Sequence, residues 1–208
     1  MRIAVIDYKA GNLRNVQKVI ESLGAESEVV STAENLKSFD GIILPGVGHF
    51  KKGMKFLNDS GLAQAIIHEA RDSKKPLIGI CLGMQLLAES GEEGGFTKGL
   101  GLLPMKVQKF NMKSRKEKLP HMGWNSVVPN KKSLLFNNIP IDSDFYFANS
   151  YHVVLYDENI SAAICNYVYP FPAAVESSNI FGTQFHPEKS QRFGNLVLQN
   201  FLSYCSNS

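Results

Sequence analysis

The sequence has few cysteines and little net charge, and these shortages exclude several classes of protein. Its three cysteines, Cys81, Cys165 and Cys205, stand far apart among 208 residues. That pattern fits neither a disulfide framework nor the paired ligand spacing of a zinc site. A net charge of +3, spread along the chain, supplies no basic patch for nucleic acid or for an anionic membrane. We therefore expect a protein of a reducing compartment, with neither a metal nor a cofactor.

Long apolar runs are also missing. No run approaches the roughly 20 residues needed to span a bilayer. Met1 and Arg2 lead directly into the apolar run at residues 3–6, without the architecture of a signal peptide. Repeats, low-complexity tracts and linkers are not evident either. We expect a soluble, cytoplasmic protein whose 208 residues form one domain, residues 1–208.

The first half of the chain alternates short apolar runs with segments of helical spacing. The runs at residues 3–7, 29–30, 40–44 and 76–81 indicate strands, and helical spacing follows at residues 13–23, 50–58 and 61–73. This alternation predicts an α/β fold with a mostly parallel, open sheet flanked by helices. Because ligands gather at the carboxyl ends of such strands, residues 45–48 and Cys81 should share one rim of the sheet.

The second half of the chain changes character. Glycines at residues 91–101 indicate a long, flexible loop, and the charged run at residues 113–118 indicates a solvated loop. Short β segments separated by turn residues predict added antiparallel strands, and a closing helix is expected around residues 196–202. The expected β segments are residues 107–110, 127–128, 145–153, 160–167, 173–176 and 180–185.

The pattern Gly-x-Cys-x-Gly at residues 79–83 ends the apolar run before it. It predicts a buried strand, a sharp turn that exposes Cys81, and a helix. Flanking glycines let substrate approach and tolerate strained backbone, and the N-terminus of the helix favours a thiolate. The alternative is a buried structural cysteine. The symmetric glycines favour the reactive thiol.

A cysteine nucleophile needs a base, and the base must be oriented by a third group. His186-Pro187-Glu188 offers both at the end of the apolar run 180–185. Residues two apart on an extended segment point the same way, so Glu188 can hold the ring of His186 and stabilise its imidazolium. Three other histidines are better explained as ordinary surface or core residues: His49, His68 and His152.

Acyl transfer also needs hydrogen-bond donors for the developing oxyanion. Pro45-Gly46-Val47-Gly48 follows a predicted strand and exposes backbone N–H groups beside glycines that can reorient. A phosphate-binding loop is the rival interpretation. It is weaker, because the Lys-Ser/Thr ending of a P-loop is missing.

Three segments together resemble the motifs of the class I, or triad, glutamine amidotransferases. They are PGVGHF at residues 45–50, GICLGMQLL at residues 79–87 and QFHPEKS at residues 184–190. Taken jointly, these motifs are highly specific, and they extend from the first third of the chain to near its end. The segments at residues 6–12 and 120–125 further resemble the glutaminase subunits of imidazole glycerol phosphate synthase.

The resemblance implies a flavodoxin-like fold and one half of a two-protein enzyme. This chain would hydrolyse glutamine through a Cys81 thioester, with His186 as acid and base and Glu188 as its orienter. Ammonia would pass through a (β/α)8 cyclase partner, and the isolated chain would be nearly inactive. The resemblance also implies oxyanion donors at Gly48, Val47 and Leu82, a glutamine pocket with Gln85, Glu93, Tyr146, Asn149 and Ser150, and a cyclase-facing surface with His121, Trp124, Asn125 and Lys189.

Three alternatives remain open on the sequence. The chain has Asn149 where the family usually has histidine, and residues 166–172 replace a usual Tyr-Gly segment. These departures keep open a paralogous glutaminase that feeds a sugar amidotransferase of surface-polysaccharide synthesis. A cysteine peptidase or stress-type hydrolase of similar architecture is the second alternative, and a non-catalytic scaffold is the third. Release of ammonia from glutamine, without peptide cleavage, separates the glutaminases from the peptidase, and an unaltered pathway flux in a Cys81→Ala strain would favour the scaffold.

Overall fold

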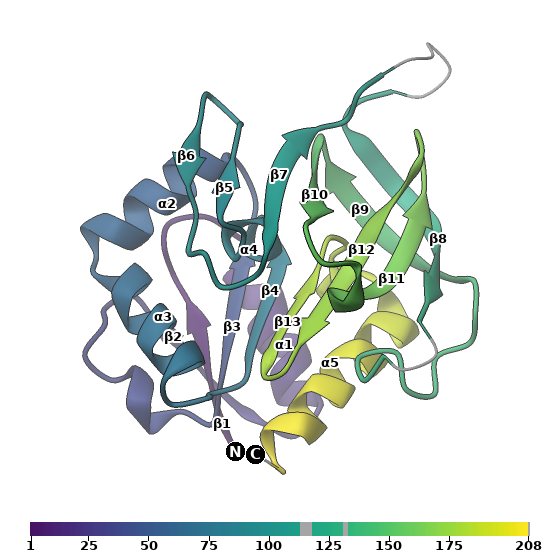
Figure 1. Cartoon of the computed structure of the whole chain (residues 1–208). Coiled ribbons are helices and arrows are strands. Elements are labelled where there is room, and N and C mark those ends of the chain that lie inside the picture. The colour runs from purple at the N-terminus through teal and green to yellow at the C-terminus, as the bar shows by residue number, and fades with distance from the viewer. Residues whose placement is uncertain (113–117, 131–132, 208) are drawn as a thin grey trace.

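The computed structural model describes residues 1–112, 118–130 and 133–207, which form two β-sheets flanked by helices (Figure 1). The larger sheet has nine strands in the order β2-β1-β3-β4-β13-β12-β11-β8-β9. Its first five strands run parallel: β2 (Glu26–Val30), β1 (Arg2–Ile6), β3 (Gly41–Gly46), β4 (Leu77–Cys81) and β13 (Ile180–Thr183). The other four are antiparallel: β12 (Pro170–Ser177), β11 (Ser161–Asn166), β8 (His121–Pro129) and β9 (Ser143–Asn149). The predicted α/β class, with antiparallel strands added by the second half, is confirmed.

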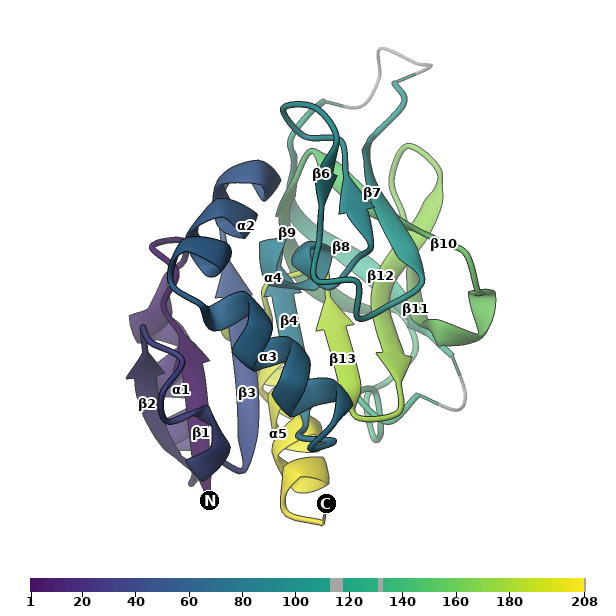
Figure 2. The ribbon, with the colours of Figure 1, turned by 60° about the vertical axis from the view of Figure 1, so that its left-hand side comes forward.

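Helices cover both faces of the parallel strands. Figures 1 and 2 show α2 (Phe50–Asp59) and α3 (Leu62–Arg71) on one side, and α1 (Leu13–Ser22) and α5 (Gln191–Cys205) on the other. Alternation along β1 explains the two cores, because Ala4 and Ile6 pack with α2 and α3 while Ile3 and Val5 pack with α1 and α5. The described residues also contain three short 3-10 turns: η1 (Leu36–Ser38), η2 (Glu158–Ile160) and η3 (Pro187–Lys189).

A second, four-stranded sheet lies beside the first and was not foreseen from the sequence. Its order is β10 (Tyr151–Leu155), β7 (Met105–Lys109), β5 (Ser90–Gly91) and β6 (Thr97–Lys98). Residues 91–101, expected to form a long flexible loop, instead supply β6 and the end of β5. Backbone hydrogen bonds from Gly99 to Glu89 and from Leu100 to Leu86, both 2.9 Å, fix this segment, and the side chain of Leu100 is buried. Of the charged run at residues 113–118, expected to form a solvated loop, all but Lys118 lie outside the described residues.

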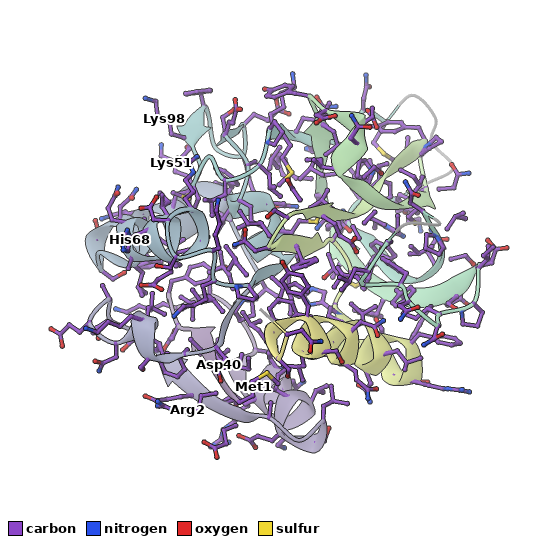
Figure 3. The ribbon with its side chains drawn as sticks, turned by 60° about the horizontal axis from the view of Figure 1, so that its bottom comes forward. Met1, Arg2, Asp40, Lys51, His68 and Lys98 are labelled. Atoms are coloured by element: carbon purple, nitrogen blue, oxygen red, sulfur yellow. The ribbon has the colours of Figure 1, made fainter. Side chains whose placement is uncertain are left out.

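The amino ends of the parallel strands lie at the opposite edge from the catalytic motifs. Figure 3 shows Met1, Arg2 and Asp40 gathered there, and the backbone N–H of Arg2 donates to the Asp40 carboxylate at 2.7 Å. The C-terminus of the described chain ends nearby, since the Ser206 hydroxyl lies 3.5 Å from the sulfur of Met1. Among the described residues, no helix has the length and apolar character needed to cross a bilayer. The catalytic motifs lie at the other edge of the sheet, where the parallel strands have their carboxyl ends.

Candidate active site

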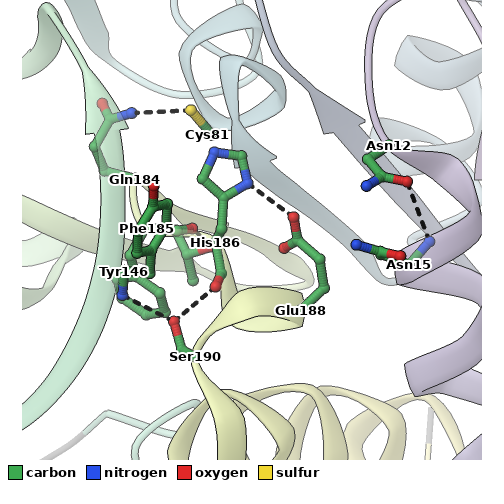
Figure 4. Close-up of polar contacts among 10 residues, drawn as sticks. Asn12, Asn15, Cys81, Tyr146, Gln184, Phe185, His186, Glu188 and Ser190 are labelled. Atoms are coloured by element: carbon green, nitrogen blue, oxygen red, sulfur yellow. Dashed lines mark hydrogen bonds and ion pairs between the residues drawn. The ribbon is translucent and has the colours of Figure 1, made fainter. Parts of the chain in front are cut away.

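Three neighbouring strands bring the sequence motifs to one edge of the sheet. Gly46 at the end of β3 is the register partner of Cys81 at the end of β4, so the glycine-rich loop begins beside the sulfur. On the other side, Thr183 of β13 pairs with Ile80, and the chain then continues to His186. Figure 4 shows Cys81, His186 and Glu188 converging at this edge. The predicted proximity of the glycine-rich loop and Cys81 is therefore present in the structure.

Cys81 occupies a strained turn. Its backbone has φ 53° and ψ −108°, a region that residues with a Cβ rarely adopt. The side chain is 5% exposed and borders a cleft. The helix after it, α4 (Leu82–Leu86), has only five residues, so its dipole supports a thiolate less than the sequence suggested.

The two flanking glycines allow close backbone packing, a role that the sequence analysis did not foresee. A Cβ on Gly83 would lie 1.7 Å from the carbonyl oxygen of Leu44 on β3. A Cβ on Gly79 would lie 2.6 Å from the backbone of Gly83. The turn therefore folds back closely on β4 and β3, and only glycine allows the backbones to approach this far.

His186 and Glu188 form a buried ion pair behind the sulfur. The Nδ1 atom of His186 lies 2.8 Å from Oε1 of Glu188, and both side chains are almost fully buried. The two residues are connected through the 3-10 turn η3, whereas the sequence had suggested an extended segment. Because the carboxylate accepts at Nδ1, it fixes the ring and leaves Nε2 for chemistry. Nε2 faces the sulfur of Cys81 (Figure 4) but has no well-formed hydrogen bond among the described residues.

These neighbours keep His186 charged. Burial lowers the pKa of His186, but interactions with the Cys81 sulfur and the Glu188 carboxylate raise it, and the resulting pKa is about 10. The ring is therefore an imidazolium at neutral pH, and an imidazolium favours a thiolate beside it. A thiolate nucleophile with a proton donor at its side is the arrangement that acyl transfer from an amide requires.

Removal of the sulfur should lower this pKa. Cys81 and Glu188 both raise the pKa of His186, and a Cys81→Ala variant keeps only Glu188. The pKa of His186 is therefore expected to fall by one unit or more from about 10. The ring then loses its charge at lower pH than in the parent chain. Titration of the imidazole ¹⁵N resonances measures this shift. Cys205→Ala, at the far end of α5, is the control, and equal His186 pKa values in the two variants would contradict the pairing.

A cleft of about 230 Å³ opens beside Cys81. This volume is below the roughly 300–1,000 Å³ typical of drug-sized ligands, so the cleft suits a molecule of amino-acid size. The expected oxyanion residues and four of the five expected pocket residues border it. The lining consists of Val47, Gly48, Cys81, Leu82, Gln85, Glu93, Pro120, Ala148, Asn149, Ser150 and Tyr151.

A larger cavity of about 620 Å³ lies elsewhere, beside Glu176 on β12. The Glu176 carboxylate is already bound, at 2.6–2.9 Å, by the Ser133 hydroxyl and by the backbone N–H groups of Leu134 and Leu135. This carboxylate therefore holds a turn in place. Size alone does not identify the site, and the chemistry favours the smaller cleft.

Glu93 connects the cleft to the start of α2. Its carboxylate accepts a hydrogen bond of 2.7 Å from the backbone N–H of Phe50 and lies 4.0 Å from Nδ1 of His49. A carboxylate at a helix N-terminus is stabilised by the free N–H groups there. Glu93 thus anchors its own segment to the residues that directly follow the glycine-rich loop.

The structure places Tyr146 away from the cleft, which corrects the expectation that it borders the pocket. Tyr146 is the register partner of Trp124, and their ring centroids are 6.1 Å apart. The Nζ atom of Lys189 lies 5.6 Å from the Tyr146 ring centroid. Tyr146 therefore belongs with the exposed aromatic group at β8, and the cleft is lined by later residues of the same strand and by Tyr151.

The expected partner-facing residues divide into two groups. Trp124 is 48% exposed and shares one face of β8 with Met122 and Val128, which are 65% and 48% exposed. His121 points the other way and is buried between the rings of Phe147 and Tyr167, at 4.6 and 3.9 Å. Burial lowers the pKa of His121 to about 4. His121 therefore contributes no exposed surface, and this part of the expectation is wrong.

Two asparagines, Asn125 and Asn149, donate hydrogen bonds to backbone carbonyl oxygens. Asn125 donates a 2.9 Å hydrogen bond to the carbonyl oxygen of Asn166, at the start of the segment that departs from the family pattern. Asn149 lines the cleft and donates to the carbonyl oxygen of Tyr151 at 3.0 Å, while its Oδ1 has no partner among the described residues. The Oδ1 atom of Asn149 is thus available as a hydrogen-bond acceptor at the edge of the cleft.

Sequence reasoning missed two residues of the site. Gln184, within the recognised QFHPEKS segment, directs its amide at the sulfur of Cys81 at 3.7 Å. Its position two residues before His186 was the available signal. Tyr8 is buried beneath the glycine-rich loop, with its hydroxyl 1.9 Å from where a Cβ on Gly46 would be, and that hydroxyl has no partner among the described residues. No sequence pattern indicates where this ring points.

Comparisons with known proteins agree with this geometry. Residues 4–204 match the family described as glutamine amidotransferase class-I. The chain is 47% identical over 199 residues to imidazole glycerol phosphate synthase subunit HisH of Desulfitobacterium hafniense, covering 96% of this chain and 92% of that protein. It is 45% identical over 200 residues to subunit HisH 1 of Campylobacter jejuni, covering 96% of this chain and 98% of that protein.

Solved structures share the fold. A glutamine amidotransferase from Thermotoga maritima superimposes with a TM-score of 0.71 at 15% identity, covering 100% of this chain and 99% of that one. PurLQS from the same organism gives a TM-score of 0.72 at 22% identity, covering 98% of each chain. With the matched family, the close relatives and the Cys81, His186 and Glu188 arrangement in view, the chain belongs to the class I glutamine amidotransferases and is an enzyme of that family.

Proposed function

We propose that this chain is the glutaminase subunit of an imidazole glycerol phosphate synthase. It hydrolyses L-glutamine to glutamate and ammonia, and the ammonia passes to a (β/α)8 cyclase partner in histidine biosynthesis. The observation that carries the chemistry is the buried His186–Glu188 pair at 2.8 Å, with the free ring nitrogen facing Cys81. The identity of 45–47% to HisH proteins supports the choice of partner. We further propose that residues 1–208 form one domain and that the protein is cytoplasmic, where its three unpaired cysteines stay reduced.

The first half of the reaction uses His186 as an acid. The thiolate of Cys81 attacks the side-chain amide carbon of glutamine, and the amide oxygen gains negative charge. Val47, Gly48 and Leu82 border the cleft, and their backbone N–H groups stabilise that oxyanion. The imidazolium of His186 then gives its proton to the leaving nitrogen, so ammonia departs and a glutamyl thioester remains.

The second half uses the same ring as a base. Neutral His186 takes a proton from a water molecule as that water attacks the thioester carbon. The carbon–sulfur bond breaks, glutamate leaves, and the thiolate and imidazolium are restored. Glu188 stabilises the imidazolium form of the ring each time it appears, and it keeps Nε2 directed at the reacting atoms. Among the residues that border the cleft, Glu93, Asn149 and the Gln85 Oε1 atom supply acceptors for the ammonium group of glutamine.

The partner binds the exposed face of β8. Met122, Trp124 and Val128 form an apolar stripe on that face, and Tyr146 with Lys189 lies beside it. Trp is enriched at binding hot spots, so Trp124 is the expected anchor. An exposed apolar stripe on a β-strand needs a partner to cover it.

Co-purification and isotope transfer test the assignment. The chain, co-expressed with the (β/α)8 cyclase of its own organism, should co-purify with it and transfer ¹⁵N from amide-labelled glutamine into the imidazole ring of the cyclase product. Trp124→Ala should weaken the complex roughly 30-fold, as expected of a hot spot worth about 2 kcal/mol. Tyr156→Ala is the matched control, because Tyr156 is 57% exposed and follows β10 in the other sheet. Co-purification with a sugar amidotransferase instead, or ammonia release without ¹⁵N transfer, would overturn the assignment.

A further inference from the structure

The side chain of Gln184 lies in direct contact with the nucleophile. Gln184 follows β13, is fully buried, and donates a hydrogen bond from Nε2 to the sulfur of Cys81 at 3.7 Å (Figure 4). By contrast, Nε2 of His186 faces the same sulfur without a well-formed hydrogen bond among the described residues. In the resting site the sulfur thus has the amide of Gln184 as a hydrogen-bond donor, in addition to the ring of His186 that faces it.

A chain of hydrogen bonds fixes which end of the amide faces Cys81. The carbonyl oxygen of Tyr151 can only accept, so Gln85 must present its NH₂ group there, at 3.0 Å. The same nitrogen donates its second hydrogen to Oε1 of Gln184, at 3.1 Å. With its oxygen so engaged, Gln184 has only its NH₂ group left to point at the sulfur. The backbone of Tyr151 therefore sets the orientation of both glutamines.

A role in packing alone does not account for this arrangement. A buried amide loses its hydrogen bonds to water, and an apolar side chain of similar size would fill the same space without that cost. Gln184 instead makes two hydrogen bonds: its Oε1 accepts one from Gln85, and its NH₂ group donates the other to the one atom that must become anionic. An N–H donor stabilises the charged form of its acceptor, and a hydrogen bond to a charged group is stronger than one between neutral groups.

We propose that Gln184 is a further catalytic residue, whose amide stabilises the Cys81 thiolate before attack and again when the thioester breaks, and that Gln85 is the positioning residue which holds that amide in place. The role in turnover rests on the proposed glutaminase function. The effect on the sulfur itself does not, because it exists in the chain without substrate. Gln85 also lines the cleft, so the network joins the substrate cavity to the nucleophile.

Alkylation of Cys81 by iodoacetamide as a function of pH tests the proposal on the full chain. Peptide mass spectrometry counts only the Cys81 adduct. Gln184→Met removes the donor at similar volume, and the pH midpoint of alkylation is expected to rise by about one unit, with about a 10-fold lower rate at pH values below the parent midpoint. Gln184→Glu keeps the shape but places a carboxylate near the sulfur, and a larger rise is expected because like charges repel.

Thr183→Val is the matched control. Thr183 is a fully buried polar neighbour whose hydroxyl donates to the carbonyl oxygen of Phe185 rather than to the sulfur. It should lose some thermal stability but keep the parent pH profile. A folded Gln184→Met or Gln184→Glu chain with the parent profile would overturn the proposal. If the complex of the unsubstituted chain with its partner does not hydrolyse glutamine, the proposed function is refuted. The alkylation result would remain valid in that case.

Discussion

Replacing Cys81 with alanine is expected to lower the rate of ammonia release from glutamine by about 10⁴-fold or more, measured on the complex with its partner. The reaction proceeds through a covalent thioester, so a side chain without sulfur removes the pathway rather than one stabilising contact. Residual activity would come only from binding and oxyanion stabilisation in the cleft. Steady-state ammonia production, coupled to a glutamate assay, gives the rate.

Cys165→Ala provides the control for this loss. Cys165 is also buried and unpaired, but it lies on β11, away from the cleft. Its removal should leave kcat within a few-fold of the parent value, with a modest loss of thermal stability from the small cavity. A Cys81→Ala complex that retained more than about one tenth of the parent rate would mean that the sulfur is not the nucleophile.

Replacing Gly83 with alanine is expected to have the largest effect on folding. The added methyl carbon would lie 1.7 Å from the carbonyl oxygen of Leu44, and no flexible side chain can move to make room because the neighbour is backbone. The turn must then separate from β3, which would cost roughly 3–5 kcal/mol of unfolding free energy. Because the same turn positions Cys81, activity should be lost even in the fraction that folds.

Gly95→Ala distinguishes crowding from backbone strain. Gly95 has φ +97°, but a Cβ there would meet nothing within 4 Å. Alanine at this position should therefore cost only the conformational penalty of about 1–2 kcal/mol. Urea denaturation of both variants compares them directly. Equal unfolding free energies would refute the view that close backbone approach requires glycine at position 83.

Much of the site follows from local patterns. The run before Cys81 with its flanking glycines predicts a strand and a sharp turn, and the topology of parallel strands predicts that residues 45–48 lie on the same rim. Gly46 is indeed the register partner of Cys81. His186 and Glu188 were recognisable as a pair because they are two residues apart at a strand end, although a 3-10 turn rather than extended chain brings them together.

Other features depend on contacts between distant segments, which no local pattern records. Tyr146 and His121 both lie on antiparallel strands, and which face each side chain takes is set by the pairing of β8 with β9. Gln184 meets Cys81 and Gln85 through contacts about 100 residues apart in the chain. The four-stranded sheet arises because β7 pairs with β10 across more than 40 residues. These arrangements required the structure.

The central claim is that Cys81 forms a glutamyl thioester under the control of His186. Intact-protein and peptide mass spectrometry of the partner complex, treated with a diazo-ketone analogue of glutamine, tests it most directly. We predict one covalent adduct per chain, located on Cys81, suppressed by excess glutamine and formed far more slowly in a His186→Ala complex. An adduct on another residue, or none at all in a complex that still releases ammonia from glutamine, would contradict the claim.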